Sequence, residues 1–420
     1  MTTASRLTDN RFLWSTGRWA PVVVATTLLF TGCRGQDHET AKVTADQRWV
    51  EVRADLKLDM AEKAFEEHRY EDAAMNAAET LALAPGKHSA YAIMVRSYLE
   101  MQDLERTKEA LATADAAAVD YPEMTYLRGV YLEMRGRYEE ALTCFADARS
   151  RVPEDADYMV AQVEMLMQLD RAAPALRIIN EFLARADETD SLTTMAGIVA
   201  EAAGDHQQAI RWYHKACLAH SDQRWIHERL AAILIQQGRH DQAIHWLTPF
   251  YSRIMPQRNS SSTSAPISED DVKLMSLMVK AKLGAGLERE ALDIQRKIVH
   301  LAPENLNHRL LQIQIAMRTG AYDAALEASR NALYHFPDHG ELQLMAATTL
   351  RKMGRLQEAK ERIETVLARS AADTDAHCLL AEILAEQGRN EEARTSFQKA
   401  LDSDPQCHWA QVGLKRLTSS

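Results

Sequence analysis

The chain has 420 residues, of which 46% are hydrophobic and 26% charged, and this balance excludes both a disordered chain and a protein with many membrane spans. Its 16 glycines and 11 prolines are too few for a turn-rich sandwich or barrel. The net charge is −11. Proteins that bind nucleic acid independently of sequence usually carry the opposite sign, so we expect no nucleic-acid partner.

The first 32 residues differ from the rest. A few arginines precede a short apolar run over residues 20–30, which ends in small residues before Cys33. This order is typical of a secretory signal, and the run is shorter than the 20 or so residues that a membrane span needs. The alternatives are a simple signal peptide or an uncleaved anchor.

The residues Phe30-Thr31-Gly32-Cys33 resemble the bacterial lipobox, although that motif usually has leucine where Phe30 stands. The resemblance implies that Cys33 is lipidated and anchors the chain to an envelope membrane, with the periplasmic side of the outer membrane as the expected location. Two acyl chains hold a protein stably on a bilayer without a span. The polar residues 33–47 are predicted to be a tether.

The remaining chain repeats with a period of 34 residues. Hexads that begin with glycine and end with alanine recur at this interval or at twice it, with one interval longer by 14; they lie at 136–141, 204–209, 238–243, 286–291, 320–325, 354–359 and 388–393. Ten repeats then begin at residues 54, 88, 122, 156, 190, 224, 272, 306, 340 and 374.

Three positions of the repeat indicate its fold. Position 15 is glycine in seven of the ten repeats, position 20 is alanine in nine, and position 32 is proline in five. Glycine can end a first helix in the left-handed conformation, alanine lets two helices approach closely, and proline cannot extend the second helix. Since one helix pair has too little apolar surface to fold alone, we predict an all-α solenoid of stacked two-helix repeats.

These positions resemble the tetratricopeptide repeat. The similarity is clearest in repeat 3, with Gly129, Tyr138, Ala141, Phe145, Ala148 and Pro153, and in repeat 10, with Ala381, Gly388, Ala393, Phe397, Ala400 and Pro405. It is weakest in repeats 2 and 4, which carry Gln102, Thr107, Asp170 and Pro174. The resemblance implies an α–α superhelix that binds other proteins.

The predicted organisation has six parts: a signal peptide (1–32), a tether (33–47), repeats 1–6 (48–257), a Ser/Thr-rich insertion (258–271), repeats 7–10 (272–407), and a capping helix with a tail (408–420). The insertion either separates a six-repeat lobe from a four-repeat lobe or forms a bulged loop that leaves the stacking unbroken.

No motif in the chain indicates catalysis or a bound cofactor. Six of the 15 histidines lie between residues 206 and 245, but no two of these six have the i, i+4 spacing of helical metal ligands. We therefore expect packing histidines, no metal, and no enzymatic activity. The cysteines beyond Cys33 lack a CxxC spacing and are predicted to be free thiols, although an exported protein meets oxidising conditions; they are Cys144, Cys217, Cys378 and Cys407.

The resemblance implies that positions 2, 5, 9, 12 and 13 of each first helix line a concave groove. The predicted groove residues are Tyr126, Val130, Met167, Ile198, Ile235, Leu310, Met317, Arg318, Leu344, Arg351 and Lys352. Acidic residues lie early in the groove and basic residues late, so we expect a polypeptide with opposite charges at its ends. Alternatively, the apolar positions only pack the first helices against their neighbours.

The sequence thus predicts a lipid-anchored scaffold or adaptor of the bacterial cell envelope that binds a protein or peptide. Two alternatives remain open. One is an accessory subunit of an export, pilus or polysaccharide assembly machine. The other is an envelope protein that binds a small ligand or a metal through its histidine-rich repeats.

Overall fold

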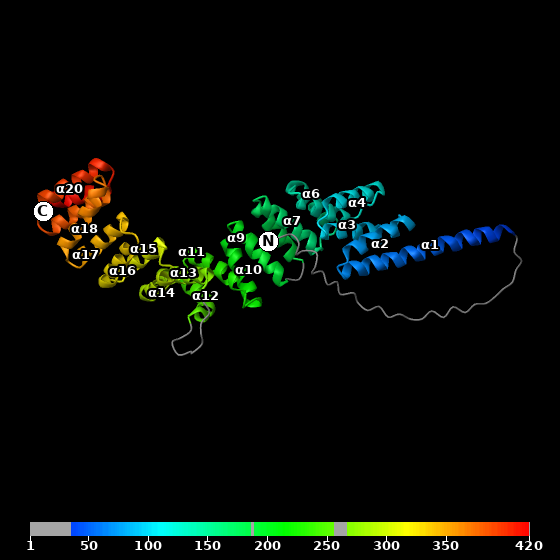
Figure 1. Cartoon of the computed structure of the whole chain (residues 1–420), viewed down its shortest axis with the longest axis horizontal. Coiled ribbons are helices and arrows are strands. Elements are labelled where there is room, and N and C mark those ends of the chain that lie inside the picture. Colours follow the sequence, from blue (N-terminus) through cyan, green and yellow to red (C-terminus); the bar gives the residue numbers. More distant parts are fainter. Residues whose placement is uncertain (1–34, 186–188, 256–266, 420) are drawn as a thin grey trace. The chain divides into compact units, whose positions relative to one another are not determined.

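The structure, a computed structural model, describes residues 35–185, 189–255 and 267–419. Every regular element in these ranges is a helix, which confirms the predicted all-α class (Figure 1). Residues 1–34 lie outside the described residues, and with them the predicted signal peptide and Cys33. The chain divides into two compact units between Gln208 and Ala209.

The N-terminal unit is a succession of helices in which each one packs on the next along the chain. Its helices are α1 (Gly35–Glu66), α2 (Tyr70–Leu83), α3 (His88–Glu100), α4 (Leu104–Ala116), α5 (Pro122–Met134), α6 (Tyr138–Arg151), α7 (Ala156–Gln168), α8 (Ala172–Leu183) and α9 (Asp190–Ala202).

The C-terminal unit begins within α10 and continues the alternation of first and second helices. Its helices are α10 (His206–Ala219), α11 (Arg224–Gln236), α12 (His240–Ile254), α13 (Glu269–Gly284), α14 (Glu288–Leu301), α15 (Leu306–Arg318), α16 (Tyr322–His335), α17 (Gly340–Lys352), α18 (Leu356–Arg369), α19 (Thr374–Glu386), α20 (Asn390–Ser403) and α21 (His408–Ser419). The last of these is the predicted capping helix, and it packs on α20 and α19.

Position 15 of the repeat is left-handed in all ten copies. The seven glycines have φ between 71° and 78°, as predicted, and the non-glycine residues His68, Gln102 and Asp170 have φ of 60°, 55° and 56°. The backbone hydrogen bond that ends the first helix is the same in repeats with and without this glycine. Arg137 N donates to Leu132 O at 2.9 Å after Gly136, and Asp103 N donates to Tyr98 O at 2.9 Å after Gln102. The turn therefore keeps the same geometry in every repeat, including the three repeats that have no glycine at position 15.

Small residues and prolines act as the sequence predicts. All nine alanines at position 20 are fully buried, and so is Thr107, the one exception at this position. The prolines at position 32 each lie two residues beyond the end of a second helix; they are Pro85, Pro153, Pro303, Pro337 and Pro405. The alanines permit close helix crossings and the prolines follow each helix end.

Helix α1 begins earlier than the sequence analysis suggests. Residues 33–47 are predicted to be a tether, but the structure includes the segment from Gly35 onward in α1. The physical reason is that residues 36–66 contain no glycine or proline and many good helix formers. The role of this segment as a membrane tether stays a prediction.

The insertion does not interrupt the stack. Helix α12 packs against α13, and α11 also contacts α13, so repeats 6 and 7 are neighbours in the C-terminal unit. Helix α13 begins at Glu269, inside the range 258–271 predicted for the insertion. The chain therefore divides into units within repeat 5, between Gln208 and Ala209, and not at the insertion.

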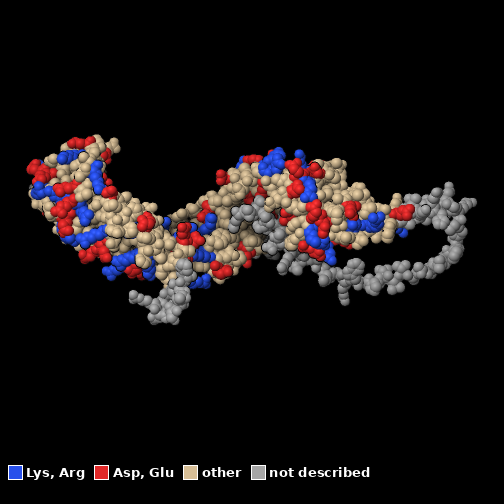
Figure 2. Space-filling view, viewed as in Figure 1, with Lys and Arg blue, Asp and Glu red and all other residues tan. Residues whose placement is uncertain are grey.

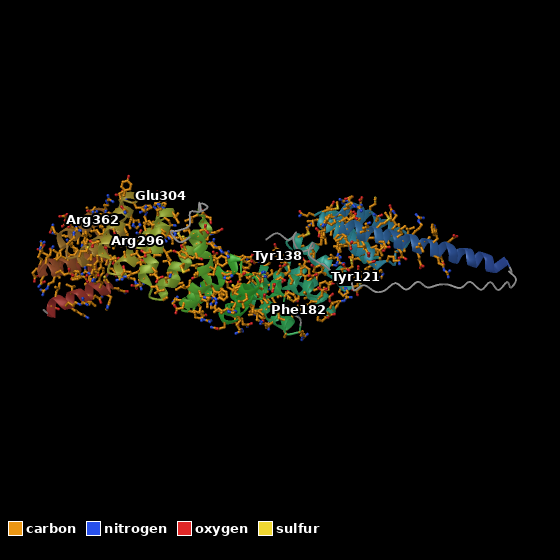
Figure 3. The ribbon with its side chains drawn as sticks, turned by 90° about the horizontal axis from the view of Figure 1, so that it is seen from below. Tyr121, Tyr138, Phe182, Arg296, Glu304 and Arg362 are labelled. Atoms are coloured by element: carbon orange, nitrogen blue, oxygen red, sulfur yellow. The ribbon has the colours of Figure 1, made fainter. Side chains whose placement is uncertain are left out.

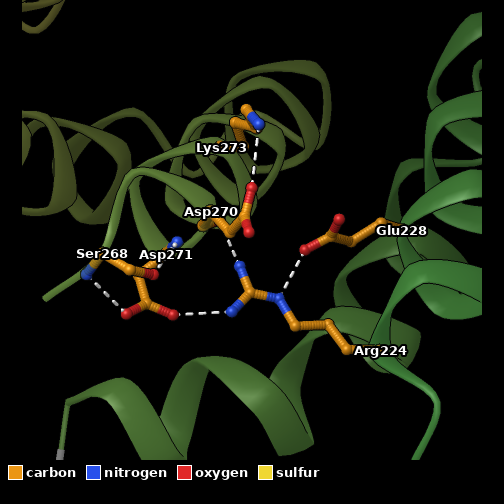
Figure 4. A network of polar contacts seen from close by, with 6 residues as sticks. All are labelled: Arg224, Glu228, Ser268, Asp270, Asp271 and Lys273. Carbon is orange, nitrogen blue, oxygen red and sulfur yellow. Dashed lines mark hydrogen bonds and ion pairs between the residues drawn. The ribbon is translucent and has the colours of Figure 1, made fainter.

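A network centred on Arg224 joins the two sides of the insertion (Figure 4). Arg224 lies at the start of α11, and its Nε and Nη1 atoms lie 2.5 Å from Glu228 Oε1 and 2.6 Å from Asp271 Oδ1. Asp271 in turn caps α13, because its Oδ2 accepts from Ser268 N at 2.9 Å while Asp271 N donates to Ser268 Oγ at 3.2 Å. The guanidinium thereby positions the first turn of α13 on α11.

Candidate functional site

The first helices of the last repeats line an open cavity of about 550 Å³ in the C-terminal unit. Its apolar lining consists of Met317 from α15, Leu344 and Met345 from α17, Leu379 from α19 and Trp409 from α21. The side chains of Leu344 and Leu379 also belong to the core between α17, α18 and α19, which fixes their position. A pocket with an apolar base and a few polar groups is the usual form of a binding site.

Most of this lining occupies the groove positions that the sequence analysis names. Met317, Arg318 and Leu344 are predicted groove residues at positions 12, 13 and 5, and all three line the cavity. Met345 and Leu379 occupy position 6, which the prediction omits. Trp409 lies in the predicted capping helix, where it is position 2 of an eleventh first helix, and that register is the sequence signal for its place in the groove.

The rim of the cavity is acidic. Glu341 and Asp375 are exposed residues of the lining, and neither makes an ion pair with any residue that the structure describes. Arg318, the cation of the lining, lies 2.7 Å from Glu288 Oε1. The two free carboxylates therefore set the charge that a ligand meets at this rim.

The basic residues predicted late in the groove include Arg351 and Lys352, and the charge of Arg351 is balanced by neighbouring carboxylates. Arg351 Nη1 lies 2.5 Å from Glu382 Oε2 and 2.9 Å from Glu386 Oε1, and its side chain is only 15% exposed. Glu382 also accepts a hydrogen bond of 2.7 Å from Trp409 Nε1. Arg351 thus braces α17 against α19 and, through Glu382, helps to hold the indole of Trp409. Lys352 is exposed at the end of α17 and does not line the cavity.

The predicted groove residues of the N-terminal unit are half-buried on first helices. Tyr126, Val130, Met167 and Ile198 lie on α5, α7 and α9. The Tyr126 ring lies 5.0 Å from Tyr158 and 5.4 Å from Phe145, so it packs repeats 3 and 4 together. Tyr126 therefore contributes to the alternative role, in which an apolar position packs neighbouring helices.

The two remaining predicted groove residues lie in the C-terminal unit. Ile235 on α11 and Leu310 on α15 are half-buried, and neither lines the cavity of α15, α17, α19 and α21. The structure therefore brings three of the eleven predicted residues together around this cavity, and the others lie along the first helices outside it.

The surface carries both signs of charge side by side. Figure 2 shows Lys and Arg interspersed with Asp and Glu on the visible face. Some charged residues of the chain form ion pairs between consecutive repeats. Arg106 and Glu71 lie 2.7 Å apart, and Arg171 and Glu139 lie 2.5 Å apart. Such exposed pairs contribute little to stability and leave no large patch of one sign on this face.

A second cavity of about 520 Å³ lies beside α14 and α16 and is more polar. Arg296 and Arg309 contribute to its lining, and Arg309 Nε donates to Pro303 O at 2.6 Å. Figure 3 labels Arg296 and Glu304, which belong to this part of the C-terminal unit. Because the buried Arg309 is already satisfied by a backbone carbonyl, this cavity is a weaker candidate for a binding site.

The histidine-rich repeats form an aromatic cluster. The rings of His214, His227 and His245 lie 5.2, 5.4 and 5.5 Å from that of Trp246. His227 is buried, and burial lowers its pKa, so it is neutral near pH 7. In the part of the chain that the structure describes, no three His, Cys, Asp or Glu side chains come together as metal ligands would.

Comparison with known proteins supports the repeat assignment. A family model of the tetratricopeptide repeat matches residues 94–156, 126–191 and 344–406. The matched residues thus form tetratricopeptide repeats, and proteins with such repeats generally mediate protein–protein interaction. A comparison with curated proteins finds no match. No helix within the described ranges is both long enough and apolar enough to cross a membrane.

Several solved structures are similar in fold at low identity. A structure of Naa15/Naa10 bound to HypK-THB is 14% identical over 85% of this chain with a TM-score of 0.43, and the match spans 64% of that chain. PilF of Pseudomonas aeruginosa is 15% identical over 50% of this chain and 94% of its own, with a TM-score of 0.42. YrrB, described as a tetratricopeptide-repeat protein with an unusual peptide-binding site, is 16% identical over 48% of this chain and 97% of its own, with a TM-score of 0.36.

Proposed function

We propose that the protein is a non-catalytic scaffold that binds a polypeptide segment in the cavity formed by α15, α17, α19 and α21. The observation that carries this proposal is the apolar base of Met317, Leu344, Leu379 and Trp409 on four successive first helices. Apolar hollows with a polar rim mark sites where other molecules bind.

The charged residues at the rim of the cavity indicate which charge the bound polypeptide segment carries. Glu341 and Asp375 are exposed and unpaired, whereas Arg318 and Arg351 are engaged by Glu288 and Glu382. The segment that fits this site carries one or two large apolar side chains next to a lysine or arginine. This proposed segment differs from the sequence-based expectation of a polypeptide with opposite charges at its two ends.

Site-specific photo-crosslinking tests this binding mode. A photoreactive phenylalanine at Leu344 is expected to crosslink one partner segment, identified by mass spectrometry, and Trp409→Ala is expected to abolish that crosslink. The matched control is the same probe at Leu301, a 38% exposed leucine on the second helix α14, outside the cavity. Equal crosslinking of the same segment from both positions would rule out the cavity as the binding site.

We further propose that the chain is exported and held on a bacterial envelope membrane by acylation of Cys33. The support is the sequence alone: a short apolar run followed directly by Thr31, Gly32 and Cys33. Two acyl chains would tether the repeats to the membrane and leave them in the aqueous phase.

Membrane fractionation of the full chain tests the anchor. The unaltered protein is expected in the membrane fraction, and the Cys33→Ser variant is expected to leave it. If the Cys33→Ser variant stays with membranes to the same extent, an uncleaved apolar segment holds the protein and the acyl anchor is wrong. This outcome is independent of the crosslinking result.

A further inference from the structure

Two cysteines that are 29 residues apart in the sequence lie in contact near the C-terminal end of the stack. Cys378 Sγ and Cys407 Sγ are 3.7 Å apart. Cys378 is fully buried in α19, and Cys407 is half-buried immediately before α21. The repeat pattern conceals this contact, because the two residues occupy positions 5 and 34 of repeat 10.

We propose that Cys378 and Cys407 form a reversible disulfide that fastens the capping helix α21 to α19. A disulfide requires the two sulfur atoms to approach to about 2.05 Å, so each has to move by less than about 1 Å from its present position. Cys407 lies in the turn between α20 and α21, where its backbone N donates to Asp404 O at 3.0 Å, and a turn can absorb such a shift.

The surroundings of the other thiols distinguish this pair from them. Cys144 belongs to the N-terminal unit, and Cys217 is a buried residue of α10. Among the described cysteines, Cys378 and Cys407 are the two whose sulfur atoms meet. A free cysteine packs as a small hydrophobic residue and needs no second cysteine beside it, so packing alone does not account for the contact between these two sulfur atoms.

The order of the chemical steps follows from burial. Burial raises the pKa of the Cys378 thiol to about 12, and its contact with Cys407 adds to this effect, so Cys378 stays protonated near neutral pH. Cys407 is the more accessible of the two thiols, so its sulfur attacks first. With oxidised glutathione as the oxidant, it forms a mixed disulfide and releases one glutathione.

Cys378 then completes the exchange. As it loses its proton, its sulfur attacks the sulfur of Cys407, the bond between Cys378 and Cys407 forms, and the second glutathione leaves. In sum, two protein thiols are oxidised to one disulfide, and one oxidised glutathione is reduced to two molecules of glutathione, which take up the two protons.

The crosslink would act on the binding cavity that we propose above. Leu379 follows Cys378 directly, and Trp409 lies two residues after Cys407. Both side chains line the cavity, so the disulfide would fix the distance between α19 and α21 where these helices border it. This consequence rests on the proposed function, whereas the disulfide itself does not.

Mass spectrometry of the full chain after equilibration with oxidised glutathione tests the disulfide. The protein used carries Cys33→Ser, Cys144→Ser and Cys217→Ala, so that only the pair remains. We expect a product that lacks two hydrogen atoms, has no bound glutathione and resists alkylation until reduced. The melting temperature of the C-terminal unit is expected to rise by about 5 to 10 °C.

The matched control removes one thiol by Cys378→Ala in the same background. It is expected to stop at one glutathione bound to Cys407, with no rise in melting temperature. Free thiols, a persistent glutathione adduct, or a dimer linked between chains in the unaltered pair would each overturn the proposal. Circular dichroism establishes that both proteins are folded. None of these readouts depends on the partner segment.

Discussion

We expect Gly129→Ala to lower the free energy of unfolding of the N-terminal unit by about 2 kcal/mol. A Cβ atom on Gly129 would lie 2.5 Å from Phe145 Cε1. Phe145 is fully buried and its ring already packs against Tyr126, so it has no space into which to move. The steric cost therefore exceeds the gain of about 1 kcal/mol that alanine brings to a helix interior.

Thermal and denaturant unfolding measure this effect against a matched glycine. In Gly86→Ala, the new Cβ would meet no atom within 4 Å, so we expect a change within about 0.5 kcal/mol. Replacing Phe145 by leucine in the Gly129→Ala background should recover part of the loss, because it removes the ring atoms nearest the new methyl group. If Gly129→Ala and Gly86→Ala have the same stability, the close packing of α5 on α6 is wrong.

We expect Arg224→Gln to lower the free energy of unfolding of the C-terminal unit by about 2 kcal/mol. The side chains of Glu228 and Asp271 are only 22% and 19% exposed. The substitution therefore leaves these two largely shielded carboxylates without their cation. It also removes the guanidinium that joins α11 to the first turn of α13.

A double-mutant cycle with Asp271→Asn measures this interaction, with a coupling energy of about 1 kcal/mol or more expected. The control is Lys273→Gln, which breaks a pair with Asp270 whose side chains are 69% and 74% exposed, and which should leave the stability unchanged within the error of the measurement. Additive effects of Arg224→Gln and Asp271→Asn would contradict the network drawn in Figure 4.

The same network gives a pH dependence. Burial raises the pKa of Asp271, but hydrogen bonds from Ser268 and the charge of Arg224 outweigh it, and the pKa is lowered overall. A carboxylate with a lowered pKa stabilises the fold above its unfolded pKa of about 3.9, and the contribution disappears as the pH falls through the folded pKa. Asp271→Asn should therefore flatten the acid side of the stability profile.

The periodic features of the fold could be predicted from the sequence because each repeat carries its own turn and helix signals. The first helices α3, α5, α7 and α9 begin at the residues where the 34-residue period places them. The left-handed conformation at His68, Gln102 and Asp170 is inherited from the register of the repeat, although none of these residues is glycine.

The remaining features depend on contacts between repeats, which a single-repeat pattern does not contain. The neutralisation of Arg351 by Glu382 and Glu386 involves residues of the next repeat, and so does the hydrogen bond from Trp409. The contact of Cys378 with Cys407 lies within repeat 10, but it joins two positions that are 29 residues apart in the sequence. Such pairings become visible only when the helices are stacked.

The affinity of the crosslinked segment for the full chain tests the groove assignment most directly. Titration calorimetry with the segment as a synthetic peptide is expected to show about 100-fold weaker binding to Leu344→Glu, which places a charge in the apolar base of the cavity. Leu301→Glu, with an equal change of charge on α14, should bind the peptide as the unaltered protein does. Unchanged affinity for Leu344→Glu, in a protein with an unchanged melting temperature, would contradict the assignment.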